Sequence, residues 1–173
     1  CFAYQYTKDE ELYNILTWAC EELLKTQDEL GRISTYTSDH EFCGWDMWCR
    51  KYALVGMLYY LDICKDERLK ERIISACKKH LDYVLKKVGS GENQKPITQT
   101  SHWWGCVNSC TILEPTIEIY KLTNESRYLD FAKYIISTGG SADCNLLELA
   151  MGDLYPYQYP VTKAYEMMSF YEG

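Results

Sequence analysis

The feature of this sequence that most restricts its fold is an alternation between two kinds of helical segment. Residues 45–64 are apolar around most of the expected helix, with Trp48 and Leu58 on different faces. A helix of that kind is buried on most sides. The following segment, which ends near Val88, has one apolar face and one basic face. This pair of patterns predicts an inner helix with an outer helix packed on it.

The same pair then repeats further along the chain. An apolar helix is expected at 107–122, and an amphipathic helix is expected at 125–137 after a break at Thr123-Asn124. A constant offset of 59 residues (127 − 68) relates Ile63, Asp66 and Arg68 to Leu122, Glu125 and Arg127. A repeated unit of this kind indicates stacked helical hairpins.

Helices are also expected at both ends of the sequence. Thr7, followed three residues later by Glu10, is a capping pattern and predicts a helix that runs to about Gln27. A third inner helix is expected to begin near Pro160, because proline suits a first helical turn. We expect its apolar residues Met167, Met168 and Phe170 to be exposed.

The connections within this pattern are of two lengths. Inner helices lead to outer helices through short breaks, whereas long loops at 28–44, 89–105 and 139–159 lead to the next inner helix. The third loop holds a short expected helix at 146–150. This asymmetry predicts an all-α fold whose hairpins form part of an (α/α)₆ barrel or toroid. A solenoid of 34-residue helical repeats is the competing architecture, but its loops would be uniform.

Composition restricts the kinds of partner. Lys and Arg number 18 against 25 Asp and Glu, for a net charge of −7, which argues against nucleic acid and against an anionic membrane surface. The nine Cys residues form no C-x₂-C pair, so we expect no disulfide framework and a reducing compartment such as the cytoplasm. The 16 Tyr and 5 Trp residues predict an aromatic core or cleft.

Unusual side chains gather in the long loops, which we expect to emerge on one rim. Aromatic rings stack on the C–H faces of sugars, and charged or imidazole groups bind hydroxyls, so these loops predict a saccharide site. Either Trp103 or Trp104 should be exposed there, whereas Trp45 and Trp48 also suit simple packing. The candidates in or beside the loops are Trp45, Asp46, His102, Trp103, Trp104 and Tyr157.

Charged residues on the inner helices complete the set of candidates. A carboxylate there must be paired or must face the central funnel, so Arg50, Glu114, Lys163 and Glu166 are expected to bind substrate or to form internal ion pairs. Lys163 and Glu166, three residues apart, are expected to form one such pair. The spacing of Cys106 and Cys110 matches no strong zinc pattern, and we expect no metal site in this chain.

Several segments resemble a known enzyme family. "WDMWCRKYALVGMLYYL", "ILEPTIEIYKLTNESRYLDFAKYIISTGG" and "YPVTKAYEMMSFYEG" resemble glycoside hydrolase family 127, the β-L-arabinofuranosidases. "TQDELGRISTYT" is similar to an early stretch of that family. The resemblance covers nearly the whole chain and implies an (α/α)₆ barrel followed by β-rich domains.

The resemblance also implies a chemistry. Members of the family are retaining hydrolases with a zinc-bound cysteine nucleophile and a glutamate acid/base, which lie later in the family's chain than "KAYEMMSFYEG". Zinc is therefore expected only in a longer protein. Where arabinofuranosidases place pocket histidines, this sequence has Tyr52, Ser109 and Lys163. We therefore expect a divergent branch of the family.

These observations predict a glycoside hydrolase that acts on glycosides derived from plant or microbial polysaccharides. Residues 1–173 are expected to form a single partial domain, roughly half of the barrel, that contributes substrate-binding residues and is inactive alone. Its expected partners are carbohydrate and either the rest of its own chain or a second copy. Two alternatives stay open: a non-catalytic helical scaffold that binds proteins, and another α/α-toroid enzyme, a lyase or epimerase, that pairs Asp46 with Glu114 or Glu166.

Overall fold

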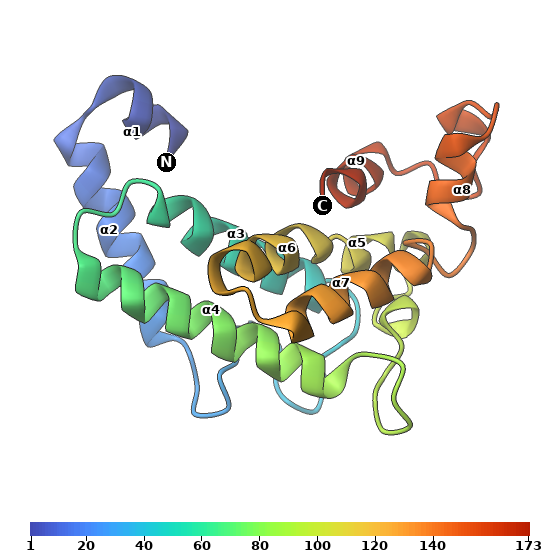
Figure 1. Ribbon diagram of the computed structural model, residues 1–173, viewed down its shortest axis with the longest axis horizontal. Helices are drawn as coiled ribbons and strands as arrows, with labels where there is room; N and C mark the ends of the chain where they lie inside the picture. Colours follow the sequence, from blue (N-terminus) through green and yellow to red (C-terminus); the bar gives the residue numbers. More distant parts are fainter. The chain divides into compact units, whose positions relative to one another are not determined.

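The computed structural model describes all 173 residues, and its only regular elements are helices (Figure 1). The all-α prediction is confirmed. No helix is both long enough and apolar enough to span a membrane. The α-helices are α1 (Phe2–Thr7), α2 (Glu10–Lys25), α3 (Asp46–Leu61), α4 (Glu67–Lys87), α5 (Val107–Cys110), α6 (Leu113–Thr123), α7 (Ser126–Ser137), α8 (Leu146–Met151) and α9 (Ala164–Glu172). Three short 3₁₀ helices accompany them: η1 (Ile97–Gln99), η2 (Trp104–Cys106) and η3 (Pro156–Gln158).

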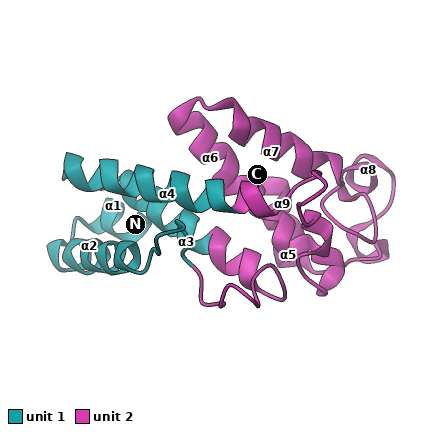
Figure 2. Ribbon diagram, turned by 90° about the horizontal axis from the view of Figure 1, so that it is seen from below, with its two compact units in different colours: residues 1–33, 52–83 teal, residues 34–51, 84–173 magenta.

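The chain divides into two compact units (Figure 2). Unit 1 contains residues 1–33 and 52–83, and unit 2 contains residues 34–51 and 84–173. Helix α3 therefore contributes its first turns to unit 2 and the rest to unit 1. Helix α4 contributes most of its length to unit 1 and its last turn to unit 2.

In unit 1, the expected single helix from Thr7 to Gln27 is in fact two helices. Lys8, with φ of 57°, ends α1 in the left-handed region, and α2 starts afterwards. The N-cap of α2 is Asp9, because its carboxylate accepts hydrogen bonds from the N–H groups of Glu11 (2.9 Å) and Leu12 (3.3 Å). Asp is as good a cap as Thr, and here it is the residue in extended conformation before the helix.

The core of unit 1 is made by α3 and α4, whose buried residues include Leu54, Met57, Ile73 and Leu81. His80 is buried with them, and its Nδ1 accepts the backbone N–H of Ile33 at 2.9 Å. His80 therefore holds the end of the loop after α2, which is the structural role that its place on an amphipathic helix indicates.

In unit 2, α6 and α7 form a tight helical hairpin. Asn124 makes the turn with φ of 54°, and its N–H donates to the carbonyl of Tyr120 at 2.7 Å. Asn is one of the few residues that enters this region at low cost. Tyr128 and Ile135 of α7 are fully buried, as the amphipathic pattern of the segment predicts.

The expected helix at 107–122 is broken between α5 and α6. Pro115 explains the break, because proline has no N–H to donate to the carbonyl of residue 111 and its ring clashes with that carbonyl. Around the break, Glu114 donates its N–H to Thr111 at 3.4 Å. The break leaves α5 as a single turn that packs against α9.

The last helix starts later than expected, at Ala164 rather than near Pro160. Tyr159 ends η3 in an extended conformation, with ψ of 150°, and Pro160 lies in a bend before α9. The expectation of three exposed apolar residues on this helix was wrong for two of them. Met167 and Phe170 are buried, whereas Met168 is 71% exposed, because the first two lie on the face that packs against α5 and α6.

Candidate functional site

The largest concentration of aromatic side chains lies in unit 2. Trp45 contacts Trp104 at 5.4 Å and Trp48 at 5.9 Å between ring centroids, and Trp48 contacts Tyr165 at 5.5 Å. Trp103 lies 5.9 Å from Trp104. We call this group the aromatic cluster; its members are Trp45, Trp48, Trp103, Trp104, Tyr165 and His102, whose ring lies 4.4 Å from that of Trp103.

Much of the aromatic cluster is accessible to solvent. Trp103 is 41% exposed, Trp104 is 37% exposed and Tyr165 is 60% exposed. Trp45 and Trp48 are half-buried beneath them. An accessible group of aromatic rings of this size is more than core packing requires, because a monomer rarely leaves such a patch uncovered without a function.

A strained turn presents Trp104 at this surface. Trp104, Gly105 and Cys106 have φ of 44°, 60° and 66°, so three consecutive residues lie in the left-handed region. Only Gly105 enters it without steric cost, and each of the others costs on the order of 1–2 kcal/mol. A Cβ at Gly105 would lie 2.3 Å from Ser141 Oγ. Strain that the surroundings maintain in this way is typical of functional sites.

The loops that carry the aromatic cluster are tied together by hydrogen bonds. The carbonyl of Gly105 accepts the N–H of Ala142 at 2.7 Å, which joins the second long loop to the third. The side-chain amide of Asn108 donates to the carbonyl of Gly44 at 3.0 Å, which joins α5 to the end of the first loop. Parts of all three loops therefore lie side by side in unit 2.

Two lysines pack on the aromatic cluster. The Lys163 ammonium lies 4.6 Å from the ring centroid of Trp104, and the Lys51 ammonium lies 5.6 Å from that of Trp48. Cation–π contacts of this length are favourable. Lys51 is 2% exposed and its Nζ lies 2.8 Å from Glu114 Oε2, while it also donates to Ser169 Oγ. Lys51 thus links α3, α6 and α9.

Buried polar atoms without a hydrogen-bond partner lie on α5 and α9. They are Glu166 Oε2, Ser109 Oγ and Asn108 Oδ1, and the residues are at most 2% exposed. Glu166 is three residues before Ser169 on α9, so the two side chains share a face of that helix. An unpaired buried polar atom costs about 1–3 kcal/mol, a cost that a hydrogen bond to another molecule would remove.

Asp46 and Arg50 form a separate network of ion pairs and hydrogen bonds. Asp46 accepts hydrogen bonds from Ser34 Oγ (2.6 Å), the N–H of Phe42 (2.8 Å) and Arg50 Nε (3.0 Å). Arg50 Nη2 also pairs with Glu41 at 2.9 Å, and neither Asp46 nor Arg50 has any exposed surface. Because both carboxylate oxygens of Asp46 and two nitrogens of Arg50 are engaged in this way, we interpret both as a structural support for the loop before α3.

The structure groups some of the predicted site residues and separates others. Trp45, His102, Trp103, Trp104 and Lys163 come together in the aromatic cluster or against it. Glu114 and Glu166 lie on the helices beneath it. Tyr157 does not join them: it is 76% exposed and stacks on Tyr155 at 5.8 Å. The expected ion pair between Lys163 and Glu166 is absent, because Lys163 lies at the N-cap of α9 and turns toward Trp104.

Several members of this site had no individual signal in the sequence. Tyr165 and Ser169 resemble ordinary residues of an apolar helix, and Asn108 resembles a helix-start residue. Lys51 carried a weak signal, since a lysine on an apolar helix needs a partner. Only the packing of α9 against α5 and α6 brings these residues together.

The nine cysteines are all free thiols. No group of three or more His, Cys, Asp or Glu residues in the chain could hold a metal ion. Burial raises the pKa of the Cys106 and Cys110 thiols above the ordinary value, so both are protonated at neutral pH. Cys106 donates its S–H to the carbonyl of Ser101 at 2.7 Å. The zinc–cysteine centre that the resemblance implies corresponds to a later part of the family's chain, and none of these cysteines is assigned to it.

Comparison with known proteins gives one match. The family model described as "Beta-L-arabinofuranosidase, GH127 catalytic domain" matches residues 1–155. No curated protein matches the chain. No solved structure matches it either. The matched residues include the four tryptophans and His102 of the aromatic cluster, while Tyr165 and Glu166 follow the matched segment.

Proposed function

Because the chain belongs to the β-L-arabinofuranosidase family, glycoside hydrolase family 127, we propose that it binds the substrate of a glycoside hydrolase. The sugar stacks on the aromatic cluster. The substrate class is a glycoside derived from plant or microbial polysaccharide. One observation carries the proposal: exposed tryptophans, held by a strained turn, adjoin helices whose buried polar atoms lack partners.

Stacking is the first step of the proposed recognition. The C–H face of a sugar ring is apolar, and it packs on an indole or phenol ring as another apolar group would. Trp103, Trp104 and Tyr165 each expose more than a third of their surface, so each offers a ring to a ligand. Because Trp104 is held on both sides, by Trp45 and by the turn at Gly105, little conformational freedom is lost on binding.

Hydrogen bonding to sugar hydroxyls is the second step. Glu166 Oε2 and Asn108 Oδ1 are acceptors, and Ser109 Oγ both donates and accepts. Each lacks a partner, so a hydroxyl that reaches it replaces an unfavourable buried atom with a hydrogen bond. A site built in this way discriminates strongly against molecules that lack the hydroxyl.

The charged residues divide into two roles under this proposal. Lys51 holds Glu114 and Ser169 in place at 2% exposure, and we assign it to positioning rather than to catalysis. Asp46 is committed to Ser34, Phe42 and Arg50, so it is poorly suited to the acid/base pairing of a lyase or epimerase. The proposal assigns no nucleophile to this chain.

Replacement of Trp104 tests the proposal. We expect Trp104→Ala to weaken binding of arabinose-containing oligosaccharides by about tenfold, because truncation of a central aromatic contact costs more than 1 kcal/mol. Trp18→Ala is the matched control, since Trp18 is 63% exposed on α2 and belongs to no part of the site. Isothermal titration calorimetry with a panel of oligosaccharides provides the measurement.

Each outcome of that comparison is informative. A loss of affinity in Trp104→Ala alone supports a saccharide site at the aromatic cluster. Equal affinities in both variants and the unchanged protein would remove the aromatic cluster from substrate binding. The absence of binding to any oligosaccharide, with binding of a protein partner instead, would favour the scaffold alternative.

A further inference from the structure

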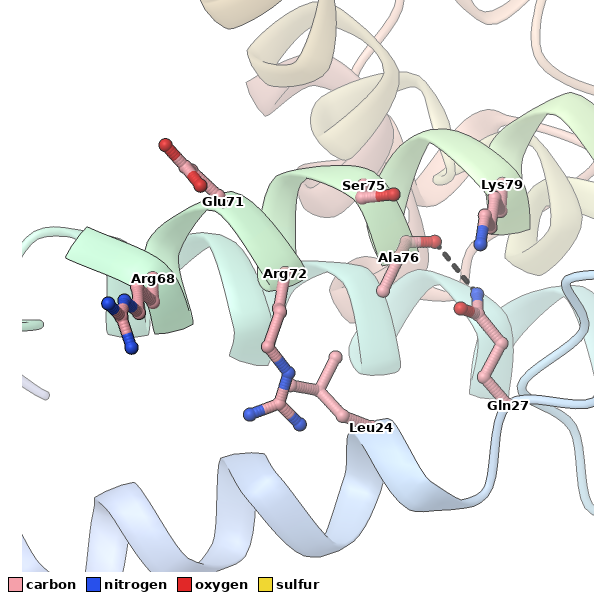
Figure 3. Close-up of a pocket in the computed structure, with 8 residues that line it drawn as sticks. All are labelled: Leu24, Gln27, Arg68, Glu71, Arg72, Ser75, Ala76 and Lys79. Carbon is pink, nitrogen blue, oxygen red and sulfur yellow. Dashed lines mark hydrogen bonds between the residues drawn. The ribbon is translucent and has the colours of Figure 1, made fainter. Parts of the chain in front are cut away.

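A concave site lies in unit 1, between α2 and α4 (Figure 3). Its volume is about 460 Å³, which is within the range of small-molecule sites. Leu24 and Gln27 of α2 form one side, and residues 68–79 of α4 form the other. None of these residues belongs to the aromatic cluster or to the buried polar groups of unit 2.

The α4 side of this groove carries a row of cations. Arg68, Arg72 and Lys79 are spaced by four and seven residues, so they follow one face of the helix. At 1.5 Å per residue, the row extends over about 16 Å. Figure 3 shows Arg72 reaching toward Leu24, whereas the carboxylate of Glu71 points away from α2. The single acidic residue of the lining therefore does not neutralise the face that α2 and α4 enclose.

These cations form few ion pairs within the protein. Arg68 and Lys79 form no ion pair through their side chains, although the chain holds 25 acidic residues. Arg72 lies 4.0 Å from Glu21, the outer limit of an ion pair, and the two side chains are 57% and 44% exposed. A pair of that kind is worth little, so a ligand anion can replace it.

The floor of the groove is ordered and amphipathic. The Gln27 side-chain amide donates to the carbonyls of Ala76 and Gly31, both at 2.9 Å, and so joins α2 to α4. Gly31 itself has φ of 89°, and a Cβ there would lie 2.8 Å from the carbonyl oxygen of Lys79. This close approach fixes the end of the groove at Lys79. Leu24 adds apolar surface to the groove, and the buried Ala76 lies at its base.

We propose that this groove binds a short acidic oligosaccharide, whose carboxylates pair with Arg68, Arg72 and Lys79. Charge complementarity selects an anion, and the apolar side chain of Leu24 accommodates a ring face between successive carboxylates. Charges beyond about 10 Å are screened at 0.1 M salt, so the net charge of −7 does not oppose a ligand of groove size. The choice of a saccharide rests on the proposed function, whereas the choice of an anion rests on the groove alone.

Calorimetric titration with tetragalacturonate tests this inference. We expect binding that weakens as NaCl rises from about 0.01 M to about 0.2 M. The variant Arg68→Gln/Lys79→Gln should bind about fivefold more weakly, as expected for the loss of two exposed ion pairs. The matched control is Lys86→Gln/Lys133→Gln, which removes two exposed cations outside the groove and leaves affinity unchanged.

Four results would overturn the inference. They are equal losses in both double variants, equal binding of neutral galactotetraose, equal binding of inorganic sulfate, and tighter binding of an oligonucleotide. Trp104→Ala separates the two proposals, because it should leave tetragalacturonate affinity at the groove unchanged. If the aromatic cluster fails to bind sugar while the groove variant still loses affinity, only the proposed function is contradicted.

Discussion

The two compact units bury different kinds of side chain. His80 is the only polar residue buried in unit 1, whose core is otherwise aliphatic, aromatic or thiol. Unit 2 buries Asp46, Arg50, Lys51 and Glu166, together with several hydroxyl and amide side chains. The residues of unit 1 to which we assign ligand binding, such as Arg68 and Lys79, lie on its surface.

This difference distinguishes packing from function. Burying a charge is unfavourable unless it is paired, and even paired charges are often no better than apolar residues of the same size. Unit 1 shows that the same chain can build a core without them. Of the charges inside unit 2, we assign Lys51 and Glu166 to the proposed site, whereas the buried polar residue of unit 1 accepts the backbone N–H of Ile33.

The largest expected effect concerns the paired network of unit 2. Arg50→Met leaves the carboxylates of Asp46 and Glu41 without their buried cation, and the free energy of unfolding should fall by about 3–5 kcal/mol. Urea denaturation measures this change. Lys121→Gln removes the exposed pair with Glu118 and serves as the control, with no measurable change expected. Similar free energies of unfolding for the two variants would contradict the proposal that buried ion pairs stabilise unit 2 more than surface ion pairs do.

The sequence predicted the helical alternation well, because hydrophobic periodicity survives in every packed helix. It also indicated the family, which is confirmed. It placed three tryptophans, Trp45, Trp103 and Trp104, in loops expected on one rim, and the structure brings them together. Two kinds of error have physical causes. Periodicity alone predicted a continuous helix at 107–122, but Pro115 breaks it. The N-cap of α2 is Asp9, whereas Thr7 was expected to cap the first helix.

The interior polar groups were harder to predict for a different reason. Lys51, Ser169 and Glu166 meet only through the packing of separate helices, and no local pattern records such a meeting. The groove of unit 1 could not be predicted from the sequence either, because its cations have the pattern of the solvent-exposed face of an outer helix. Its concavity depends on Gln27 and Gly31 of a different segment.

The single buried polar residue of unit 1 gives the next test. His80→Leu leaves the buried N–H of Ile33 without an acceptor, so the free energy of unfolding should fall by about 1–3 kcal/mol. Denaturation gives the magnitude, and hydrogen exchange at the Ile33 amide gives the location, because that amide should exchange faster. Unchanged exchange at Ile33 would mean that His80 acts only by filling space.

Glu166→Gln tests a buried charge of unit 2 in the same way. Its Oε2 is buried without a partner, so removing the charge should leave the free energy of unfolding unchanged or raise it by about 1 kcal/mol. Saccharide affinity should fall by about tenfold, because a charge-assisted hydrogen bond to a hydroxyl is lost. Thermal unfolding and calorimetry test both halves. A clear loss of stability would instead make Glu166 a structural residue like Asp46.

The effect that is smallest up to pH 9 concerns the thiols of the unit 1 core. Burial raises the pKa of Cys77 from 9.0 to about 12 and that of Cys20 to about 11. Each thiol stays protonated in the folded state while its unfolded counterpart ionises, so the stability that it contributes is complete below pH 9 and is lost as pH rises toward 12. For Cys77 the loss is about 0.4 kcal/mol at pH 9 and grows above it.

Cys77→Ala isolates this contribution. Between pH 7 and pH 11 its free energy of unfolding should fall less steeply than that of the unchanged protein, whatever the absolute cost of the lost sulfur. Cys43→Ala is the control, because Cys43 is exposed and its removal should leave the slope unchanged. Parallel slopes for Cys77→Ala and the unchanged protein would mean that the core of unit 1 opens before its thiols ionise. The loss of stability at high pH would then be attributed to unit 2, where the buried charges lie.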